Sequence, residues 1–392
     1  MEIIYIGQLL LEICINKGTI NERINKINEF KSGNSKYGIQ EFKKEGLYEK
    51  IYQRIVYLVI QFGTALKEGV NTGVYNNKKL KVKRFTGVPK STDAKYAGTK
   101  KSSKCVLFIA EGDSAMGLLK KGITHKKTPL SYDHYGLFSI QGVPLNARKE
   151  SVWKDIDGKA QLMPNNKLKN NKRIQDLMTM LGLSFLCKYE TEKELKTLRY
   201  GQVICATDQD EDGKGQIFGL LLNFFCWCWP ALVEKGFVSR FNTPIIRAFP
   251  SKKSLGIQEF YYVNDFVEWG NTVNLSKYRI KYYKGLGGHS DNVIPYMMQN
   301  LEKNRIEMVM DEDAENTLEI YFGHDTQNRK DRLKFPYESD HKEEKYEDIS
   351  TCVDENVRSF QRDNIMRKLP CVADGLTDSR RKIVYGCLKI FG

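Results

Sequence analysis

The sequence predicts an α/β fold, a parallel sheet flanked by helices, because the same local pattern occurs twice. CVLFIA (Cys105–Ala110) is rich in strand-forming residues and runs into the acidic turn EGDSA and the helical segment MGLLKKG. QVICAT (Gln202–Thr207) runs into a second acidic turn, DQDEDG, and the apolar helical segment IFGLLLNFFCWCW. In a parallel sheet such turns lie at the carboxyl ends of the strands. If the two strands share one sheet, Glu111 of the first turn meets the aspartates of the second.

The bulk composition is typical of a globular intracellular protein. The chain has 392 residues, of which 41% are hydrophobic and 28% charged, so it can form two or three compact units. It has no run of about 18 apolar residues and no secretory signal, so we expect a soluble protein with no membrane partner. Its nine cysteines lie mostly in apolar stretches without paired zinc-ligand spacing, which favours buried, reduced thiols.

The charge favours a polyanionic partner such as nucleic acid. The formal net charge is +14, and between Lys78 and Lys104 ten basic residues accompany the single acid Asp93. A solvated lysine face explains this tract as well as a phosphate-binding stripe does, so charge alone leaves both interpretations open.

The chain divides by composition into five segments. The first two are residues 1–76, expected to be helical, with one amphipathic or largely buried helix at Leu47–Leu66, and 77–103, a basic lead-in. The next two are 104–248, which contain both strand–turn–helix units, and 249–345, with strand-like pieces such as FYYV and YRIKYY and a charged tract. The last is 346–392, expected to be helical from about Thr351 with an interruption at Pro370 and Gly375. The run HKEEKYED (His341–Asp348) is expected to be a solvated linker.

The second acidic turn places Asp208, Asp210 and Asp212 close together, which requires a cation. A calcium loop of the EF-hand type opens in this way, but its twelfth position is Gly219 instead of glutamate, and a strand-like run precedes it. Magnesium fits better, because Mg²⁺ takes a few carboxylates, keeps several waters and completes its shell with substrate phosphates. Together with Glu111, these aspartates predict a metal-dependent phosphoryl-transfer site. A merely solvated turn would leave the second acidic turn unexplained.

The aromatic and histidine residues indicate no additional nucleic-acid-binding or metal-binding site. Phe224, Phe225, Trp227 and Trp229 have helical spacing in an apolar run, which favours core packing over base stacking. The histidines are dispersed without metal-ligand spacing, and His289 is the one that merits a test.

These motifs resemble, in order, the type IIA DNA topoisomerases of the eukaryotic, single-chain kind. EGDSA and DQDEDG resemble the two acidic motifs of a TOPRIM domain. The other matching stretches are KSTDAKYAGTKKSSKC, YGLFSIQGVPLNARKES, LKTLRYG, FNTPIIR, YYKGLG, NRKDRL and RDNIMRKLPCVADGLTDSRRKIVYGCLK. The resemblance covers about residues 80 to 392, and this joint order is highly specific.

The resemblance implies a Rossmann-like TOPRIM domain over residues 104–248, a mixed α+β TOPRIM extension carrying YKGLG over 249–345, and the helical start of a winged-helix DNA-gate domain over 346–392. Residues 1–76 would include the end of the transducer. The implied activity is an ATP-dependent change of DNA topology by transient double-strand breakage and strand passage. The ATP-binding domain and the nucleophilic tyrosine are expected to lie outside this chain, so the chain alone is expected to bind DNA weakly and not to cleave it.

The resemblance also implies individual roles. Glu111, Asp208 and Asp210 would bind Mg²⁺, for which Mn²⁺ or Ca²⁺ would substitute in binding, and Asp212 would support a second metal position. Glu111 would also be a general acid/base in religation. The catalytic set would be Glu111, Arg380 and Lys382, and the DNA-binding set Lys90, Lys100, Lys101, Lys284 and Gly285. The implied partners are double-stranded DNA and a second copy of the chain, joined through parts outside it, and the implied location is the nucleus.

Three local departures separate this chain from that family. KGQIF (Lys214–Phe218) is one residue longer than the family pattern and lacks its histidine, Gln141-Gly142-Val143 replaces Arg-Gly-Lys, and Thr377-Asp378 replaces Lys-Pro. Each lost basic residue would weaken DNA contacts by about one or two kcal/mol. Two other interpretations stay open: a TOPRIM nuclease that uses the same acids to activate water, and a non-catalytic DNA-binding or subunit-interaction remnant of a split gene.

Overall fold

The structure, a computed structural model, describes residues 88–156, 158–251, 256–283, 286, 293–335, 337 and 345–391. The chain forms two compact units, Met1–Lys79 and Leu80–Gly392, and all described residues belong to the second. The expected helix at Leu47–Leu66 lies outside the described residues, as do Lys284, Gly285 and His289.

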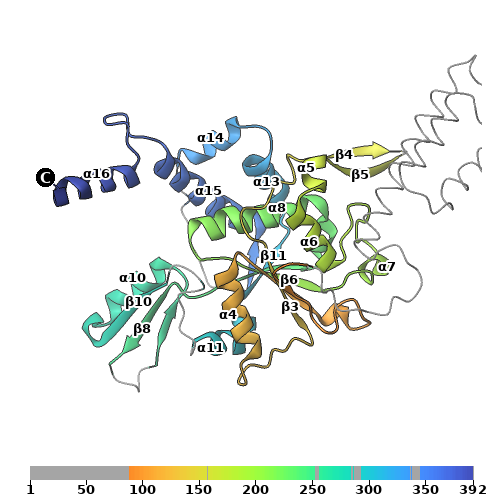
Figure 1. Ribbon diagram of the computed structural model, residues 1–392, viewed down its shortest axis with the longest axis horizontal. Coiled ribbons are helices and arrows are strands. Elements are labelled where there is room, and N and C mark those ends of the chain that lie inside the picture. The colour runs from red at the N-terminus through yellow and green to blue at the C-terminus, as the bar shows by residue number, and fades with distance from the viewer. Residues whose placement is uncertain are drawn as a thin grey trace, which may run out of the picture. The chain divides into compact units, whose positions relative to one another are not determined.

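A seven-stranded sheet forms the centre of the second unit (Figure 1). Its strand order is β1 (Ser91–Thr92), β3 (Tyr135–Ser139), β2 (Val106–Ala110), β6 (Gln202–Ala206), β7 (Val238–Phe241), β11 (Arg305–Val309) and β12 (Tyr346–Asp348). The run from β3 to β7 is parallel, whereas β1 and β11 join it antiparallel and β12 pairs parallel with β11. The predicted α/β fold with a parallel sheet is confirmed.

Both faces of this sheet are buried, because neighbouring residues of each strand enter different cores. In β2, Leu107 and Ile109 belong to the core that also contains residues of α6 (Lys172–Leu181), α8 (Gly219–Cys228), α9 (Pro230–Glu234) and α13 (Ala314–Phe322). Phe108 and Ala110 belong to the core shared with α4 (Asp113–Thr124), α11 (Val293–Gln299) and Leu301 of α12 (Leu301–Asn304). This two-sided burial explains why the predicted strands read as continuous apolar runs.

Three of the four aromatic residues predicted to be core are fully buried, and the fourth, Trp227, is half-buried against the same core. Phe224, Phe225 and Trp229 are fully buried. Trp229 stacks on Phe185 with ring centroids 5.6 Å apart, and its indole N–H donates to the Ser184 carbonyl at 3.0 Å. The fully buried rings of Phe224, Phe225 and Trp229 therefore have no face open to nucleic-acid bases.

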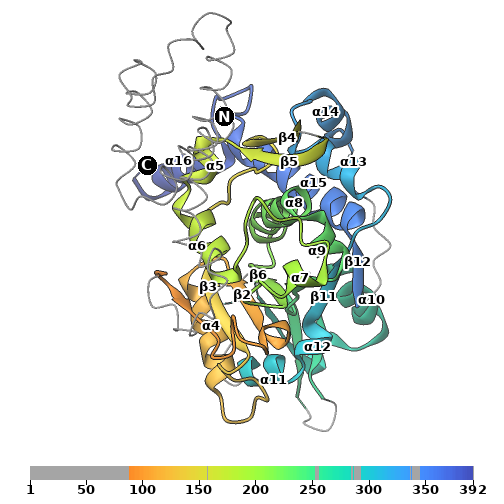
Figure 2. The same ribbon diagram turned by 90° about the vertical axis from the view of Figure 1, so that its right-hand side faces the viewer.

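Smaller elements flank the sheet on both sides (Figures 1 and 2). They are the hairpin β4 (Ser151–Ile156) and β5 (Lys159–Pro164), the short helices α5 (Asn166–Lys169) and α7 (Glu192–Leu195), the 3₁₀ turns Ser102–Lys104 and Leu275–Lys277, and a second sheet of β10 (Tyr278–Tyr282), β8 (Ile246–Pro250) and β9 (Gln258–Phe260). Helix α10 (Val263–Thr272) packs on the second sheet through Phe266 and Trp269. The expected strand FYYV is wrong after Phe260, because Val263 already begins α10.

The charged tract folds into helices that belong to the main body. It contains α13 and α14 (Gln327–Leu333), and it is followed by α15 (Ile349–Lys368) and α16 (Asp378–Phe391). The linker interpretation of HKEEKYED is wrong for its last three residues, because Tyr346–Asp348 is strand β12. His341 to Glu344 lie outside the described residues. The predicted helical end of the chain is confirmed.

The unusual segment Asp212–Phe218 is a π-helix that continues directly into α8. A π-helix is a wider turn that accommodates an extra residue within a helix. This segment contains KGQIF, the stretch with one residue more than the family pattern. The wider turn lies directly against α15: a Cβ atom added at Gly215 would be 2.3 Å from the Asn356 carbonyl oxygen and 2.4 Å from the Phe360 Cβ.

We expect Gly215→Ala to destabilise the protein by about 1–3 kcal/mol, because the added methyl group overlaps the backbone of α15. Gly117→Ala is the matched control, since a Cβ added at Gly117 within α4 would have no other atom within 4 Å, and alanine there favours the helix. Denaturant unfolding measures both variants. Equal stability of the two would contradict the close contact between the π-helix and α15.

Candidate functional site

The parallel pairing of β2 and β6 brings the two acidic turns together. Ala110 and Ala206 are partners at the ends of these strands, so both turns leave the same edge of the sheet. The Asp208 backbone N–H donates to Glu111 Oε2 at 3.0 Å, and the Glu111 N–H donates to the Ala206 carbonyl at 3.1 Å. The predicted meeting of Glu111 with the aspartate turn is confirmed.

The YKGLG segment also reaches this edge. The backbone N–H of Leu286 donates to Asp208 Oδ1 at 2.9 Å. The Asp208 carboxylate is therefore held by a segment that lies 78 residues further along the chain. Lys284 and Gly285, the neighbours expected to contact DNA, lie outside the described residues.

Asp210 orients the start of the π-helix. Its Oδ1 accepts the Gly213 N–H at 2.9 Å, and its carbonyl accepts the Lys214 N–H at 2.9 Å. A side chain at position 213 would collide with the backbone of Asp208, because an added Cβ would lie 2.3 Å from its carbonyl oxygen. The glycine after the aspartates is thus required by the close folding of the turn on itself.

Asp212 is held by an ion pair that the sequence did not reveal. Arg367, in the last turn of α15, donates from Nη1 and Nη2 to the two Asp212 carboxylate oxygens at 3.0 and 3.2 Å. Arg367 also lies 2.6 Å from Asp363, one turn earlier in α15. Because 155 residues separate Arg367 from Asp212, no local spacing in the sequence could have indicated the pair.

Burial raises the pKa of Glu111 above its ordinary value, and the charges of the three aspartates add to this rise. The hydrogen bond from the Asp208 N–H acts in the opposite direction. Glu111 therefore holds a proton more readily than an exposed glutamate does, which suits a group that takes and returns a proton.

The acidic turns supply carboxylate oxygens, the donors that Mg²⁺ prefers, but the described carboxylates do not form a closed metal site. Among the described residues, no group of three or more His, Cys, Asp and Glu side chains is gathered closely enough to hold a metal ion. Glu111 and Asp208 each have one carboxylate oxygen bonded to a backbone N–H, and Asp212 is engaged by Arg367. Carboxylates at the rim of a sheet suit an ion that keeps several waters, whereas Ca²⁺ takes six to eight oxygen ligands.

A small basic cluster adjoins Glu111. Lys90 Nζ lies 2.6 Å from Asp113 Oδ2, the Gln141 side chain donates to Asp113 Oδ1 at 3.3 Å, and Arg173 of α6 donates to the Gln141 side chain. The Gln141 N–H donates to the Glu111 carbonyl at 3.2 Å. Sequence reasoning missed Arg173, which brings a guanidinium to the position where Gln141 replaces an expected arginine.

The other predicted DNA-contact residues lie elsewhere. Lys101 and Lys100 are exposed beside the first 3₁₀ turn, with Lys101 Nζ 4.4 Å from the Tyr96 ring centroid. Arg380 and Lys382 are exposed on α16, and within the described ranges no hydrogen bond or ion pair joins either one to the acidic turns. The structure thus pairs Lys90 with Asp113, two residues after Glu111, and in the part of the chain that it describes it shows no contact that supports the expected roles of Arg380 and Lys382.

The motif LRYG (Leu198–Gly201) stabilises the fold through hydrogen bonds and an ion pair. Tyr200 donates its hydroxyl to Asp93 Oδ1 at 2.6 Å and accepts the Ala94 N–H at 2.9 Å, while Arg199 pairs with the same aspartate. Burial raises the pKa of the Tyr200 hydroxyl, and the charge of Asp93 raises it further. These bonds tie KSTDAKYAG to the segment that precedes β6, and so they hold the sheet edge in place.

Comparison with known proteins shows which family this chain resembles. Residues 241–364 match the family described as the C-terminal associated domain of TOPRIM. DNA topoisomerase 2 of African swine fever virus (isolate Pig/Kenya/KEN-50/1950) is 37% identical over 329 residues, which are 81% of this chain and 27% of the viral protein. DNA topoisomerase 2 top-2 of Caenorhabditis elegans is 31% identical over 331 residues, 79% of this chain and 20% of the worm protein. The chain is homologous to a segment of the type II DNA topoisomerases.

A solved structure agrees with this relationship. The crystal structure of the Plasmodium falciparum topoisomerase II DNA-binding, cleavage and re-ligation domain has a TM-score of 0.64 and 30% identity, and the match covers 79% of this chain and 40% of that one. The topoisomerase-related chain spans 27% of the viral relative and 20% of the worm relative. No helix in its described ranges has the length and apolar character needed to cross a membrane.

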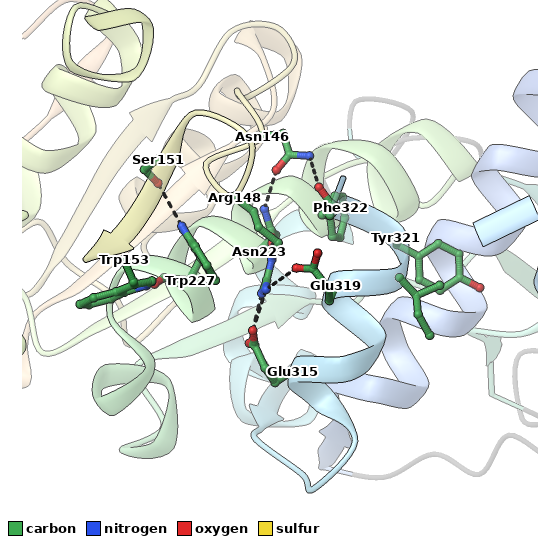
Figure 3. Close-up of polar contacts among 12 residues, drawn as sticks. Asn146, Arg148, Ser151, Trp153, Asn223, Trp227, Glu315, Glu319, Tyr321 and Phe322 are labelled. Atoms are coloured by element: carbon green, nitrogen blue, oxygen red, sulfur yellow. Dashed lines mark hydrogen bonds and ion pairs between the residues drawn. The ribbon is translucent and has the colours of Figure 1, made fainter. Parts of the chain in front are cut away.

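A buried arginine joins two helices of this topoisomerase-related chain (Figure 3). Arg148, only 3% exposed, donates to Asn223 of α8 at 3.2 Å and to Glu315 and Glu319 of α13 at 2.6 and 2.9 Å. Its guanidinium lies 4.3 Å from the Trp227 ring centroid. Asn146 continues the network by bonding Asn223 and the Phe322 carbonyl. The network fixes α8, which follows the acidic turn, against α13.

We expect Arg148→Ala to destabilise the protein by about 2–4 kcal/mol, because it removes charge-assisted bonds and leaves Asn223 buried without its donor. Arg148→Lys should recover only part of this loss, since lysine lacks the planar fork that spans two glutamates. Lys334→Ala, which removes an exposed pair with Asp331, should cost less than about 1 kcal/mol in the same unfolding experiment.

Proposed function

We propose that this chain is the metal-binding part of a type II DNA topoisomerase, the enzyme class that changes DNA topology by transient double-strand breakage and strand passage. The observation that carries the proposal is the joining of three separate motifs at one sheet edge: Glu111 accepts the Asp208 N–H, and Asp208 accepts the Leu286 N–H. The homology to DNA topoisomerase 2 over 81% of the chain supports it.

In this proposal Glu111, Asp208 and Asp210 hold Mg²⁺. When bound, the ion neutralises charge that develops on the transferred phosphoryl group and on the leaving oxygen. Glu111 takes a proton from the attacking hydroxyl during religation and returns it during cleavage. Asp208 is kept in position by the Leu286 N–H, and Lys90, Lys100, Lys101, Lys284 and Arg173 are the cations proposed to contact the DNA backbone. Arg380 and Lys382 are proposed to approach the cleaved strand from α16.

The proposal extends to partners beyond the chain. ATP would act through a domain that is not among these residues. A second copy of the chain would be joined through other parts of the protein. The enzyme would act in the nucleus. Two alternatives use the same residues. A nuclease would direct the Mg²⁺ site at water, and a non-catalytic remnant would only bind DNA or another subunit.

Metal binding tests the proposed ligands directly. We expect the 392-residue chain to bind Mn²⁺, as followed by electron paramagnetic resonance, and Asp208→Asn to lose at least about tenfold in affinity, on the scale expected for a lost ligand or its support. Asp331→Asn removes an equal charge from a pair with Lys334 and should leave Mn²⁺ affinity unchanged. Equal affinity in the two variants would refute the proposed ligand set.

The raised pKa of Glu111 predicts how metal binding depends on pH. Protons compete with the metal for this carboxylate, so Mn²⁺ affinity should fall as the pH drops through its pKa, and the fall should begin at a higher pH than for an ordinary glutamate. Glu111→Gln should bind Mn²⁺ more weakly and lose that part of the pH dependence. A pH profile identical to the wild type would remove Glu111 from the site.

Plasmid assays separate the three interpretations. With supercoiled plasmid, Mg²⁺ and ATP, we expect the chain alone to bind DNA with a steep salt dependence but neither to relax nor to nick it. Relaxation by the chain alone would overturn the expectation that its nucleophile lies elsewhere. Nicking with Mg²⁺ or Mn²⁺ that Asp208→Asn abolishes would favour the nuclease. If relaxation is recovered when the remaining domains of the enzyme are added, a non-catalytic remnant is excluded.

A further inference from the structure

We propose that one face of the small sheet formed by β8, β9 and β10 is a further contact surface for duplex DNA. This basic sheet face consists of Arg247, Phe249, Glu259, Arg279 and Lys281. The inference rests on the proposed topoisomerase function and extends it, because it names a surface that would hold the duplex beside the acidic turns. Three observations carry it: the strand register, the place where the small sheet begins, and the rings on which its exposed cations lie.

The register of the small sheet places these residues on one face. Arg279 pairs with Phe249 and Lys281 with Arg247, while Arg247 also pairs with Glu259. Because side chains alternate along a strand, the residues between them point to the opposite face. That opposite face is apolar and packs against α10 through Ile246, Ala248 and Phe260. Helix α10 therefore covers one face of the small sheet, and the basic residues lie on the other (Figure 1).

The small sheet begins at the edge of the main sheet that carries the acidic turns. Strand β7 runs parallel to β6, so its end at Phe241 lies at the same edge as Asp208. The Gln209 side chain donates to the Phe241 carbonyl at 3.3 Å, and β8 follows after a short loop. At the other connection, β10 ends at Tyr282, and the N–H of Leu286 donates to Asp208. The basic sheet face thus extends outward from the acidic edge.

The basic sheet face carries more positive than negative charge. Arg247, Arg279 and Lys281 provide three cations, against the single carboxylate of Glu259. That carboxylate already has a partner, because Arg247 Nη2 lies 2.7 Å from Glu259 Oε1 and the Arg247 side chain is only 4% exposed. Arg279 and Lys281 are exposed, and within the described ranges no carboxylate forms an ion pair with either of them. Their charge is therefore available to a polyanion.

Aromatic rings hold the two exposed cations in place. The Arg279 guanidinium lies 5.2 Å from the centroid of the Phe249 ring, and the Lys281 ammonium lies 4.9 Å from that of the Tyr283 ring. A ring neutralises no charge, so each cation keeps its attraction for phosphate. A side chain that is already ordered loses less conformational freedom when it binds. The lysines of a merely solvated surface would have no such support.

The phosphate backbone of a duplex is the occupant that fits these features. Lys281 is nearer the acidic edge, and Arg279 lies two residues before it in β10, about 7 Å further out. Arginine and lysine contact the regularly spaced phosphates of a duplex without reading its sequence. An unpaired strand fits less well, because it needs free rings for base stacking, and guanidiniums of Arg247 and Arg279 already lie against Phe249.

Fluorescence anisotropy with a labelled duplex of about 30 base pairs tests the inference on the 392-residue chain. The double variant Arg279→Gln/Lys281→Gln should bind about tenfold more weakly at low salt, and the slope of log affinity against log salt should fall by about 1.8, as for two lost phosphate contacts. Lys193→Gln/Lys196→Gln is the matched control. It removes the same charge from exposed residues of α7 and its C-terminal cap, which precede the opposite end of β6.

Phe249→Leu separates the role of the ring from that of the charges. It keeps every cation and removes the ring that lies against Arg279, so affinity should fall about two- to threefold while the salt slope stays unchanged. Denaturant unfolding of each variant shows whether the chain remains folded. Because Arg279 and Lys281 are exposed, their double variant should unfold like the wild type.

Equal duplex affinities for Arg279→Gln/Lys281→Gln and for Lys193→Gln/Lys196→Gln would overturn the inference, because they would show a diffuse effect of net charge. An equal loss of binding to poly-L-glutamate would also overturn it, since the basic sheet face would then accept an acidic polypeptide as readily as DNA. A wild-type chain that binds no duplex at low salt would instead refute the proposed function. The failure of the inference and the failure of the proposed function are thus distinguishable.

Discussion

The site depends on the parallel pairing of β2 with β6. That pairing places the ends of two strands, almost a hundred residues apart in the chain, at one edge of a sheet whose faces are both buried. The hydrogen bond from the Asp208 N–H to Glu111 then connects the two turns, and the Leu286 N–H adds the YKGLG segment. Burial, and after it the charges of the three aspartates, raise the pKa of Glu111, and the gathered carboxylates favour the arrival of a cation.

The π-helix is the second constraint, because it determines where the acidic turn ends. The wider turn accommodates KGQIF and leads directly into α8, whose residues Phe224 and Phe225 are buried in the core. The consequence appears on the outer side of the turn. Gly215 lets the backbone of α15 approach closely, and Asp212 faces Arg367 at the end of that helix. The π-helix thus connects the acidic turn with α15.

The basic residues of the chain divide into two classes by burial. Arg148 and Arg199 are enclosed by carboxylates and other polar groups, and they join elements of the fold. Lys90, Lys100 and Lys101 keep exposed ammonium groups, as residues that contact a polyanion must. Composition alone could not separate these classes, because a net charge of +14 counts a buried arginine and an exposed lysine alike.

The sequence by itself determined the α/β fold, the two strand–turn–helix units, the aromatic core of α8 and the acidic residues at the sheet edge, because each depends on a short local pattern of apolar and charged residues. Only the tertiary structure decided that Asp212 pairs with Arg367, that Arg173 reaches Gln141 and that Tyr346–Asp348 extends the sheet. These features join residues distant in the chain, and a long-range contact depends on how the helices pack, which no local spacing records. The same reason explains the two wrong predictions. The charge of HKEEKYED indicated a linker, but strand pairing makes Tyr346–Asp348 a strand. The β-propensity of FYYV indicated a strand, but Val263 begins helix α10.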